Sequence, residues 1–151
     1  YQANLYNFLE GRPTGRLLSY SPGNRQTRVR MDGLFFANGV AMGPGDEYVL
    51  VTETGAGRIH RLWLKGAKAG QRDLFAANLP GTPDNISFNG SDTFWVAMPS
   101  LRAALDAQAQ WPAVRKLLSH LPLDVLAAGV APYAFAVGLG LDGEVKANLQ
   151  N

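Results

Sequence analysis

The sequence predicts an all-β fold built on an internal repeat. Residues 36–40 read Phe-Ala-Asn-Gly-Val and residues 83–87 read Pro-Asp-Asn-Ile-Ser, and each is followed by a β-rich run, a Gly/Asp turn and a second β-rich run. Asn38 lies 46 residues before Asp84 and 47 before Asn85. Because the blades of β-propellers repeat about every 40 to 50 residues, this spacing favours a β-propeller.

A third partial repeat and the composition support the same fold. Residues 17–20 resemble residues 59–63 in pattern, at a separation of 42 to 43 residues. The chain has 151 residues, and its 17 Gly and 9 Pro, with Val, Phe, Tyr and Trp spread along it, favour short strands and turns. A single blade cannot bury its apolar faces alone, so neighbouring blades must stack. We therefore expect about three blades in this chain.

Short strands joined by turns are expected from residue 16 to residue 97. Residues 1–10 read as a short helix or an irregular segment, and a turn cluster follows at 11–15. Polar and apolar residues alternate at 27–31, which predicts a half-buried strand ending at Asp32-Gly33. The expected strands are 16–20, 27–31, 39–42, 47–52, 58–64, 72–76, 86–88 and 94–97.

The strand pattern stops after Pro99. Ser100 is a suitable helix N-cap, and the stretch after it is rich in Ala, Leu and Gln. From Val114 to Leu121 the apolar residues recur at i, i+3, i+4 and i+7, which places them on one helical face. We therefore expect residues 1–151 to form one partial propeller domain with a helical insertion at about 100–121.

The segment from Val125 to Leu141 is 17 residues long and carries no charge. Three structures fit it: a membrane span, a hairpin or lid that touches a membrane, and a loop followed by a core strand at 133–139. Gly and Pro interrupt the segment, and Asp142-Gly143 is a hairpin turn signal before residues 144–148. The loop and core strand are the expected structure.

Composition and charge exclude several classes of function. The net charge is only +2, and no Lys/Arg cluster interleaves with aromatic residues, so a nucleic-acid partner is not expected. The chain has no Cys, which excludes disulfides, thiolate metal sites and a Cys nucleophile but does not fix the compartment. It opens at Tyr1 rather than Met, so we expect it to be a piece of a longer protein.

No catalytic residue can be assigned from motifs. The chain contains no G-x-S-x-G elbow, no H-E-x-x-H pattern and no phosphate-binding glycine loop. His60 lies in an expected strand and His120 at the end of an expected helix, so each is interpreted as a packing or surface residue rather than a catalytic base.

The polar residues of the two repeat copies are the candidate metal ligands. Equivalent positions before the inner strands of neighbouring blades converge on the channel of a propeller, which would bring Asn38 close to Asp84 and Asn85. One carboxylate with several amide oxygens suits Ca²⁺, which takes 6–8 oxygen ligands at roughly 2.3–2.6 Å. The alternative is that Asn38 and Asp84 are turn residues that bond their own backbone.

Five motifs together resemble the strictosidine synthase-like family. They are Phe36-Ala37-Asn38-Gly39-Val40-Ala41, residues 48–55, residues 58–66, residues 79–86 and Phe94-Trp95-Val96-Ala97, and residues 9–18 are also typical of it. The match is dense over about residues 9–100 and is closer to the plant-type and adipocyte-membrane-associated members than to the alkaloid synthase.

The resemblance implies a six-bladed propeller related to paraoxonases, gluconolactonases and regucalcin. In the calcium-dependent hydrolases among these relatives, an Asn in an F-A-N-G motif and a D-N pair hold the central ion, and Asn38, Asp84 and Asn85 fall on those positions. A further glutamate and asparagine ligand and the paraoxonase-type histidines would lie before Tyr1. The glutamate that serves the synthase in Pictet–Spengler condensation would lie after Asn151, so this chain holds part of a site.

The expected function is calcium-dependent hydrolysis of a small ester or lactone, of the arylesterase or lactonase kind. The alternative is a non-catalytic propeller fragment that acts as a binding or membrane-associated module, and a Pictet–Spengler synthase ranks third. The expected partners are the small-molecule substrate, a second copy that completes the ring as a homodimer, and a peripheral membrane contact.

Overall fold

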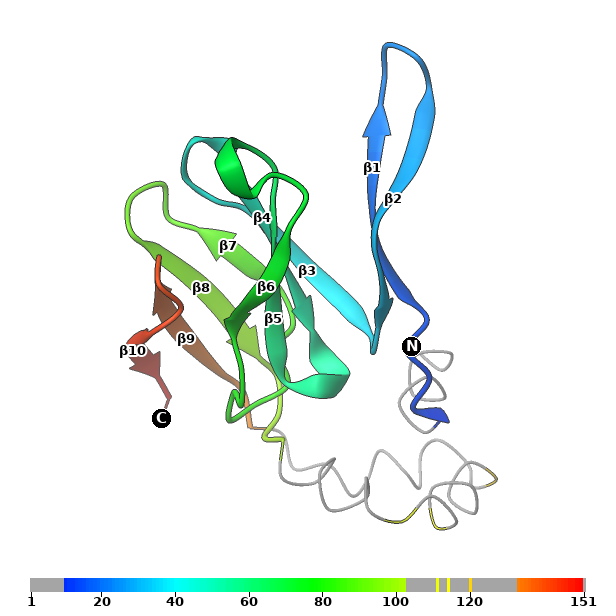
Figure 1. The fold of residues 1–151 in the computed structure, drawn as a ribbon. Helices are drawn as coiled ribbons and strands as arrows, with labels where there is room; N and C mark the ends of the chain where they lie inside the picture. The colour runs from blue at the N-terminus through cyan, green and yellow to red at the C-terminus, as the bar shows by residue number, and fades with distance from the viewer. Residues whose placement is uncertain (1–9, 103–110, 112–113, 115–119, 121–132, 151) are drawn as a thin grey trace.

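The structure, a computed structural model, describes residues 10–102, 111, 114, 120 and 133–150, and within these ranges it contains ten strands (Figure 1). The strands are β1 (Gly15–Ser21), β2 (Gln26–Leu34), β3 (Ala37–Met42), β4 (Tyr48–Glu53), β5 (Arg58–Trp63), β6 (Arg72–Ala76), β7 (Ile86–Phe88), β8 (Thr93–Met98), β9 (Phe135–Gly140) and β10 (Val145–Leu149). Three short 3-10 turns are interspersed: η1 (Pro44–Asp46), η2 (Thr54–Ala56) and η3 (Gly66–Lys68).

The strands form three antiparallel sheets that follow one another along the chain (Figure 1). Strands β3-β4-β5-β6 make one four-stranded sheet, β7-β8-β9-β10 make a second, and β1-β2 make a hairpin. The sequence of β1 resembles that of β5, which is the third strand of the β3-β4-β5-β6 sheet. The hairpin of β1 and β2 therefore corresponds to the third and fourth strands of a preceding blade. The predicted partial β-propeller is confirmed, as two four-stranded blades and half of a third.

Strand β4 explains why the sheets stack. All six of its residues are buried, although alternate side chains of a strand point to opposite faces. Tyr48 and Leu50 belong to the apolar cluster between the two four-stranded sheets. Val49 and Val51 belong to a second cluster, which they share with Leu17, Met31 and Leu34 of the hairpin and with Leu62 of β5. A strand with neighbours on both faces buries side chains on both, which suits the apolar residues of β4. The two polar residues at its end, Thr52 and Glu53, are buried as well and need hydrogen-bond partners.

The last two strands agree with the expected structure of the C-terminal segment. Strand β9, at Phe135–Gly140, overlaps the core strand predicted at 133–139, and the turn at Asp142-Gly143 leads into β10. Residues 121–132, and with them the first part of the uncharged segment, lie outside the described residues, as does most of the predicted insertion at about 100–121. In the described part of the chain, no helix has the length and apolarity to cross a membrane.

Candidate functional site

The two repeat copies lie side by side at the beginnings of the neighbouring strands β3 and β7. The Gly39 N–H donates to the carbonyl oxygen of Asp84 at 3.2 Å. A Cβ on Gly39 would lie 2.6 Å from that oxygen and 2.8 Å from the Cα of Asn85, a separation that real side chains do not tolerate. Glycine is required here because the two backbones approach so closely.

Two threonine hydroxyls link the copies further. Thr52 Oγ1 accepts from the Gly39 N–H and donates to the Asp84 carbonyl, both at 2.7 Å. Thr54 Oγ1 donates to the Pro83 carbonyl at 2.7 Å and accepts from Asn38 Nδ2 at 3.3 Å. Both threonine side chains are buried, and the bonds from the Gly39 N–H to Thr52 and from Thr54 to the Pro83 carbonyl are shielded from water, while the other two are partly buried.

The side-chain oxygens of the three candidate ligands remain available. Asn38 is half-buried, and its amide oxygen accepts no hydrogen bond from any described residue. Asp84 is also half-buried, and within the described ranges its carboxylate has neither a hydrogen bond nor an ion pair, although its backbone is bonded on both sides. Asn85 is exposed, with its carbonyl bonded to the Ala97 N–H at 2.9 Å.

This donor set fits a calcium ion in kind but not in number. One carboxylate and two amide oxygens are hard donors, and a half-buried carboxylate without a partner favours a cation nearby. Since calcium takes roughly 6–8 oxygens, the remaining ligands would be water or groups from elsewhere in the protein. Across the described residues no three His, Cys, Asp or Glu side chains gather. The metal role of Asn38, Asp84 and Asn85 stays a prediction.

Sequence reasoning missed Glu53, the buried carboxylate next to this site. Its Oε1 accepts from the Phe35 N–H at 2.7 Å, and its Oε2 contacts His60 Nε2 at 2.6 Å and Arg58 Nε. Burial acts to raise the pKa of Glu53, but the hydrogen bonds from His60, Arg58 and Phe35 outweigh it and lower the pKa to about 2. The sequence signal for a buried carboxylate was the position of Glu53 at the end of a strand that is apolar from Tyr48 to Val51.

Glu53 anchors the turn that leads to Asn38. Phe36 has a φ of 61°, an uncommon backbone conformation for an aromatic residue. The turn is held by the Glu53 carboxylate on the Phe35 N–H, and the Thr54 N–H donates to the Phe36 carbonyl at 3.0 Å. His60 is buried and bonded to Glu53, and His120 is exposed. The interpretation of both as packing or surface residues stays a prediction.

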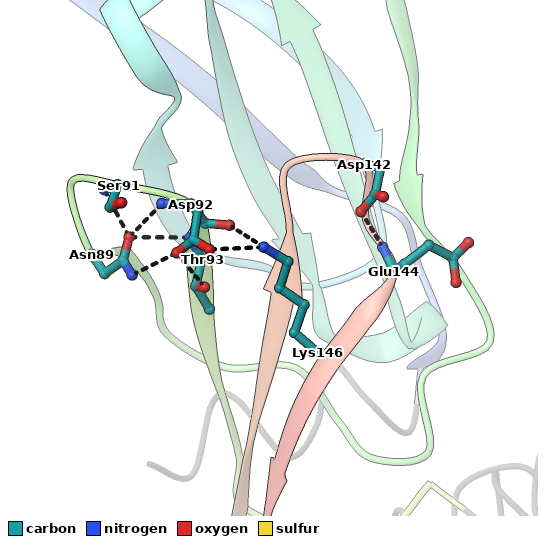
Figure 2. A network of polar contacts seen from close by, with 7 residues as sticks. All are labelled: Asn89, Ser91, Asp92, Thr93, Asp142, Glu144 and Lys146. Atoms are coloured by element: carbon teal, nitrogen blue, oxygen red, sulfur yellow. Dashed lines mark hydrogen bonds and ion pairs between the residues drawn. The ribbon is translucent and has the colours of Figure 1, made fainter.

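A second polar network lies at the opposite end of β7, in the β7–β8 turn (Figure 2). Asn89 Oδ1 accepts from the N–H groups of Ser91, Asp92 and Thr93 at 2.8 to 3.1 Å. Lys146 Nζ contacts Asp92 Oδ2 at 2.9 Å, and hydrogen bonds from Lys146, Thr93 and Asn89 lower the pKa of Asp92 to about 2. These groups, all exposed except Thr93, satisfy one another, so the network stabilises a turn.

Comparison with known proteins supports the family resemblance. A family model described as strictosidine synthase matches residues 1–67. Protein STRICTOSIDINE SYNTHASE-LIKE 10 of Arabidopsis thaliana is 40% identical over 146 residues, which are 91% of this chain and 38% of that protein. The adipocyte plasma membrane-associated protein of Homo sapiens is 34% identical over 149 residues, 95% of this chain and 36% of that protein.

Solved structures show the same fold at low sequence identity. Regucalcin from Agrobacterium tumefaciens, described as a calcium-binding protein, superposes with a TM-score of 0.61 at 11% identity and covers 92% of this chain and 37% of its own. A luciferin-regenerating enzyme also gives a TM-score of 0.61 at 11% identity, over 91% of this chain and 37% of its own. The chain spans about a third of the length of the relatives that it matches. It belongs to the strictosidine synthase-like family and forms part of that family's propeller.

Proposed function

We propose that the protein hydrolyses a small ester or lactone with the help of a calcium ion held in part by Asn38, Asp84 and Asn85. The observation that carries this proposal is the backbone contact between Gly39 and Asp84, at 3.2 Å, which brings Asn38 and Asp84 of neighbouring blades together at the starts of their strands. Among the described residues the Asp84 carboxylate has no hydrogen bond or ion pair. The description of one structural neighbour as a calcium-binding protein and of another as an enzyme adds support.

Each residue has a distinct part in this function. The Asp84 carboxylate supplies the negative charge of the ligand set, and the Asn38 and Asn85 amide oxygens supply neutral dipoles. A calcium ion, when bound, polarises a carbonyl oxygen and stabilises the oxyanion that develops on it. His60 is occupied by Glu53, at 2.6 Å, and is not assigned as the base. The group that activates water is therefore left to the rest of the protein.

The direct test is hydrolysis with and without calcium. The whole protein is assayed on aryl esters and small lactones, then after EDTA treatment, and again after Ca²⁺ is restored. We expect EDTA to remove the activity and Ca²⁺ to restore it, and Asp84→Ala to lack it under all conditions. Asp92→Ala is the matched control, because Asp92 lies in the turn at the far end of β7. Activity that resists EDTA and survives Asp84→Ala would overturn the proposal.

A second candidate function is a binding or membrane-associated module. The outer half of the β1–β2 hairpin exposes apolar side chains, with Leu18, Tyr20 and Val29 52%, 60% and 52% accessible. Such a surface needs a cover, which would be the rest of the blade, a second copy or a lipid surface. Several relatives carry the name adipocyte plasma membrane-associated protein.

Two measurements test whether a second copy or a lipid surface covers the hairpin. Light scattering at micromolar concentration detects the homodimer, and a monomeric mass removes it. Flotation with liposomes detects the membrane contact, and a triple Leu18→Ser, Tyr20→Ser, Val29→Ser variant is the control for the hairpin. Flotation that does not differ between the two proteins would place any membrane contact outside the hairpin.

A further inference from the structure

Thr52 and Thr54 lie between the two repeat copies, and the function proposed above leaves their hydroxyls without a role. The two residues are two positions apart, at the end of β4 and the start of η2, so their side chains lie on the same side of the chain. Both are buried, with 0% and 5% of the surface accessible. Each hydroxyl contacts the Asn38-Gly39 copy and one carbonyl of the Pro83-Asp84 copy. Thr52 Oγ1 also lies 3.4 Å from the Gly39 carbonyl, a longer contact than its 2.7 Å bond to the Asp84 carbonyl.

The direction of each hydrogen bond follows from the number of protons available. A threonine hydroxyl has a single proton to donate. Thr54 gives its proton to the Pro83 carbonyl at 2.7 Å, because a carbonyl can only accept. Thr54 Oγ1 must therefore accept from Asn38, which requires the NH₂ side of the Asn38 carboxamide to face it, at 3.3 Å. The Asn38 amide oxygen is in consequence turned away from Thr54.

Thr52 acts in the same way on the backbone. Its proton goes to the Asp84 carbonyl at 2.7 Å, and its oxygen accepts from the Gly39 N–H at 2.7 Å. Thr52 thus holds Asn38 through the neighbouring Gly39 and holds Asp84 through its main-chain carbonyl. The two hydroxyls set the separation of the two blades at the point where the candidate ligands lie.

We propose that Thr54, supported by Thr52, is a positioning residue that orients the Asn38 carboxamide with its oxygen free to bind the ion before the ion arrives. This inference rests on the proposed calcium site. Without the Thr54 hydroxyl, the carboxamide could rotate through its broad, roughly two-fold χ2 preference and present NH₂ to the ion half of the time. Residues that orient metal ligands typically change metal affinity about 10- to 100-fold when they are replaced.

The test compares three threonine variants of the whole protein by calorimetric Ca²⁺ titration. Thr54→Val removes the hydroxyl and keeps the shape, and we expect a loss of affinity of about 10-fold or more. Thr54→Ser keeps the hydroxyl, and the affinity should stay within about 3-fold of the unaltered protein. Thr93→Val is the control, since Thr93 is also buried but bonds Asp92 in the distant β7–β8 turn (Figure 2).

The melting temperature of the ion-free protein separates positioning from a merely structural role. If Thr54 only supports the fold, Thr54→Val and Thr93→Val lower that temperature alike and leave the Ca²⁺ affinity unchanged, which would overturn the inference. An affinity loss confined to Thr54→Val supports it. If the unaltered protein shows no Ca²⁺ binding at all, the proposed function itself is removed, and the inference with it.

A second measurement needs no variant and covers the case in which Thr54→Val does not fold. Nitrogen-15 labelling of asparagine lets the Asn38 side-chain NH₂ be followed by NMR in the ion-free protein. We expect its protons to exchange slowly with water before Ca²⁺ is added as well as afterwards, because the Thr54 bond exists beforehand. Rapid exchange of the Asn38 amide in the absence of Ca²⁺ would show that the hydroxyl does not hold it.

Discussion

The Gly39 N–H and the Asp84 carbonyl oxygen, 3.2 Å apart, join the first strands of two neighbouring blades. The contact connects residues far apart in the sequence at the same position of successive repeats. It leaves no room for a Cβ on Gly39, since that atom would lie 2.6 Å from the Asp84 oxygen. Close packing of the two backbones thus requires glycine at position 39, whether or not an ion is bound.

Gly39→Ala is expected to lower the free energy of unfolding by about 1 to 3 kcal/mol, the usual range for overpacking. The new methyl group meets main-chain atoms, which cannot move without separating β3 from β7. Urea unfolding at neutral pH measures the change. Gly23→Ala is the control, because a Cβ there meets nothing within 4 Å. Equal stability of the two variants would contradict the close contact.

Asp84→Ala is expected to abolish the calcium-dependent rise in melting temperature. A ligand that binds only the folded state at 100 times its Kd adds about 2.7 kcal/mol of stability. Thermal scans with EDTA and with a Ca²⁺ series measure this shift in the unaltered protein, in Asp84→Ala and in the control Asp92→Ala. If Asp84→Ala keeps the full shift, calcium binds elsewhere.

Glu53→Gln is expected to cost about 3 kcal/mol at neutral pH, because the amide cannot pair with the Phe35, Arg58 and His60 donors together. Glu47→Gln is the control, since Glu47 is exposed. Urea unfolding of both variants gives the difference. A cost for Glu53→Gln no larger than that for Glu47→Gln would show that the buried network does not hold the turn before Asn38.

The same carboxylate predicts how stability depends on pH. The pKa of Glu53 is lowered from 4.5 to about 2 in the folded chain, so between these values the unfolded chain binds the extra proton. Its contribution, on the order of 3 kcal/mol at 1.36 kcal/mol per pKa unit, is complete above about pH 4.5 and is lost as the pH falls toward 2. Unfolding free energies between pH 6 and 3 should fall less steeply in Glu53→Gln than in the unaltered protein; parallel curves would contradict the lowered pKa.

Asn89→Ala is expected to destabilise the β7–β8 turn by about 1 kcal/mol, as for other side-chain oxygens that accept from free backbone N–H groups. Asn89 Oδ1 accepts from three successive residues, Ser91 to Thr93 (Figure 2). Asn89→Asp keeps an acceptor oxygen and should lose less. Hydrogen exchange of the Thr93 amide gives a local readout; unchanged exchange in Asn89→Ala would argue against the turn's dependence on Asn89.

Much of the strand order could be predicted because its signals are local. The Asp142-Gly143 turn, the alternation at 27–31 and the repeat of Asn38 at Asp84 are all visible within short windows. The expected strand at 58–64 became β5 at Arg58–Trp63, and the expected strand at 72–76 became β6 at Arg72–Ala76. Such patterns depend on side-chain alternation and turn chemistry, which the nearest neighbours decide.

By itself, the sequence determined the repeat, the propeller and the three candidate ligands. The tertiary structure decided that Thr52 and Thr54 bridge the copies, through bonds to residues 32 and 29 positions away. It also decided that Glu53 is buried beneath the turn before Asn38. Hydroxyl and carboxylate groups accept many partners with similar energy, so their roles depend on which groups the folded chain brings within hydrogen-bond distance.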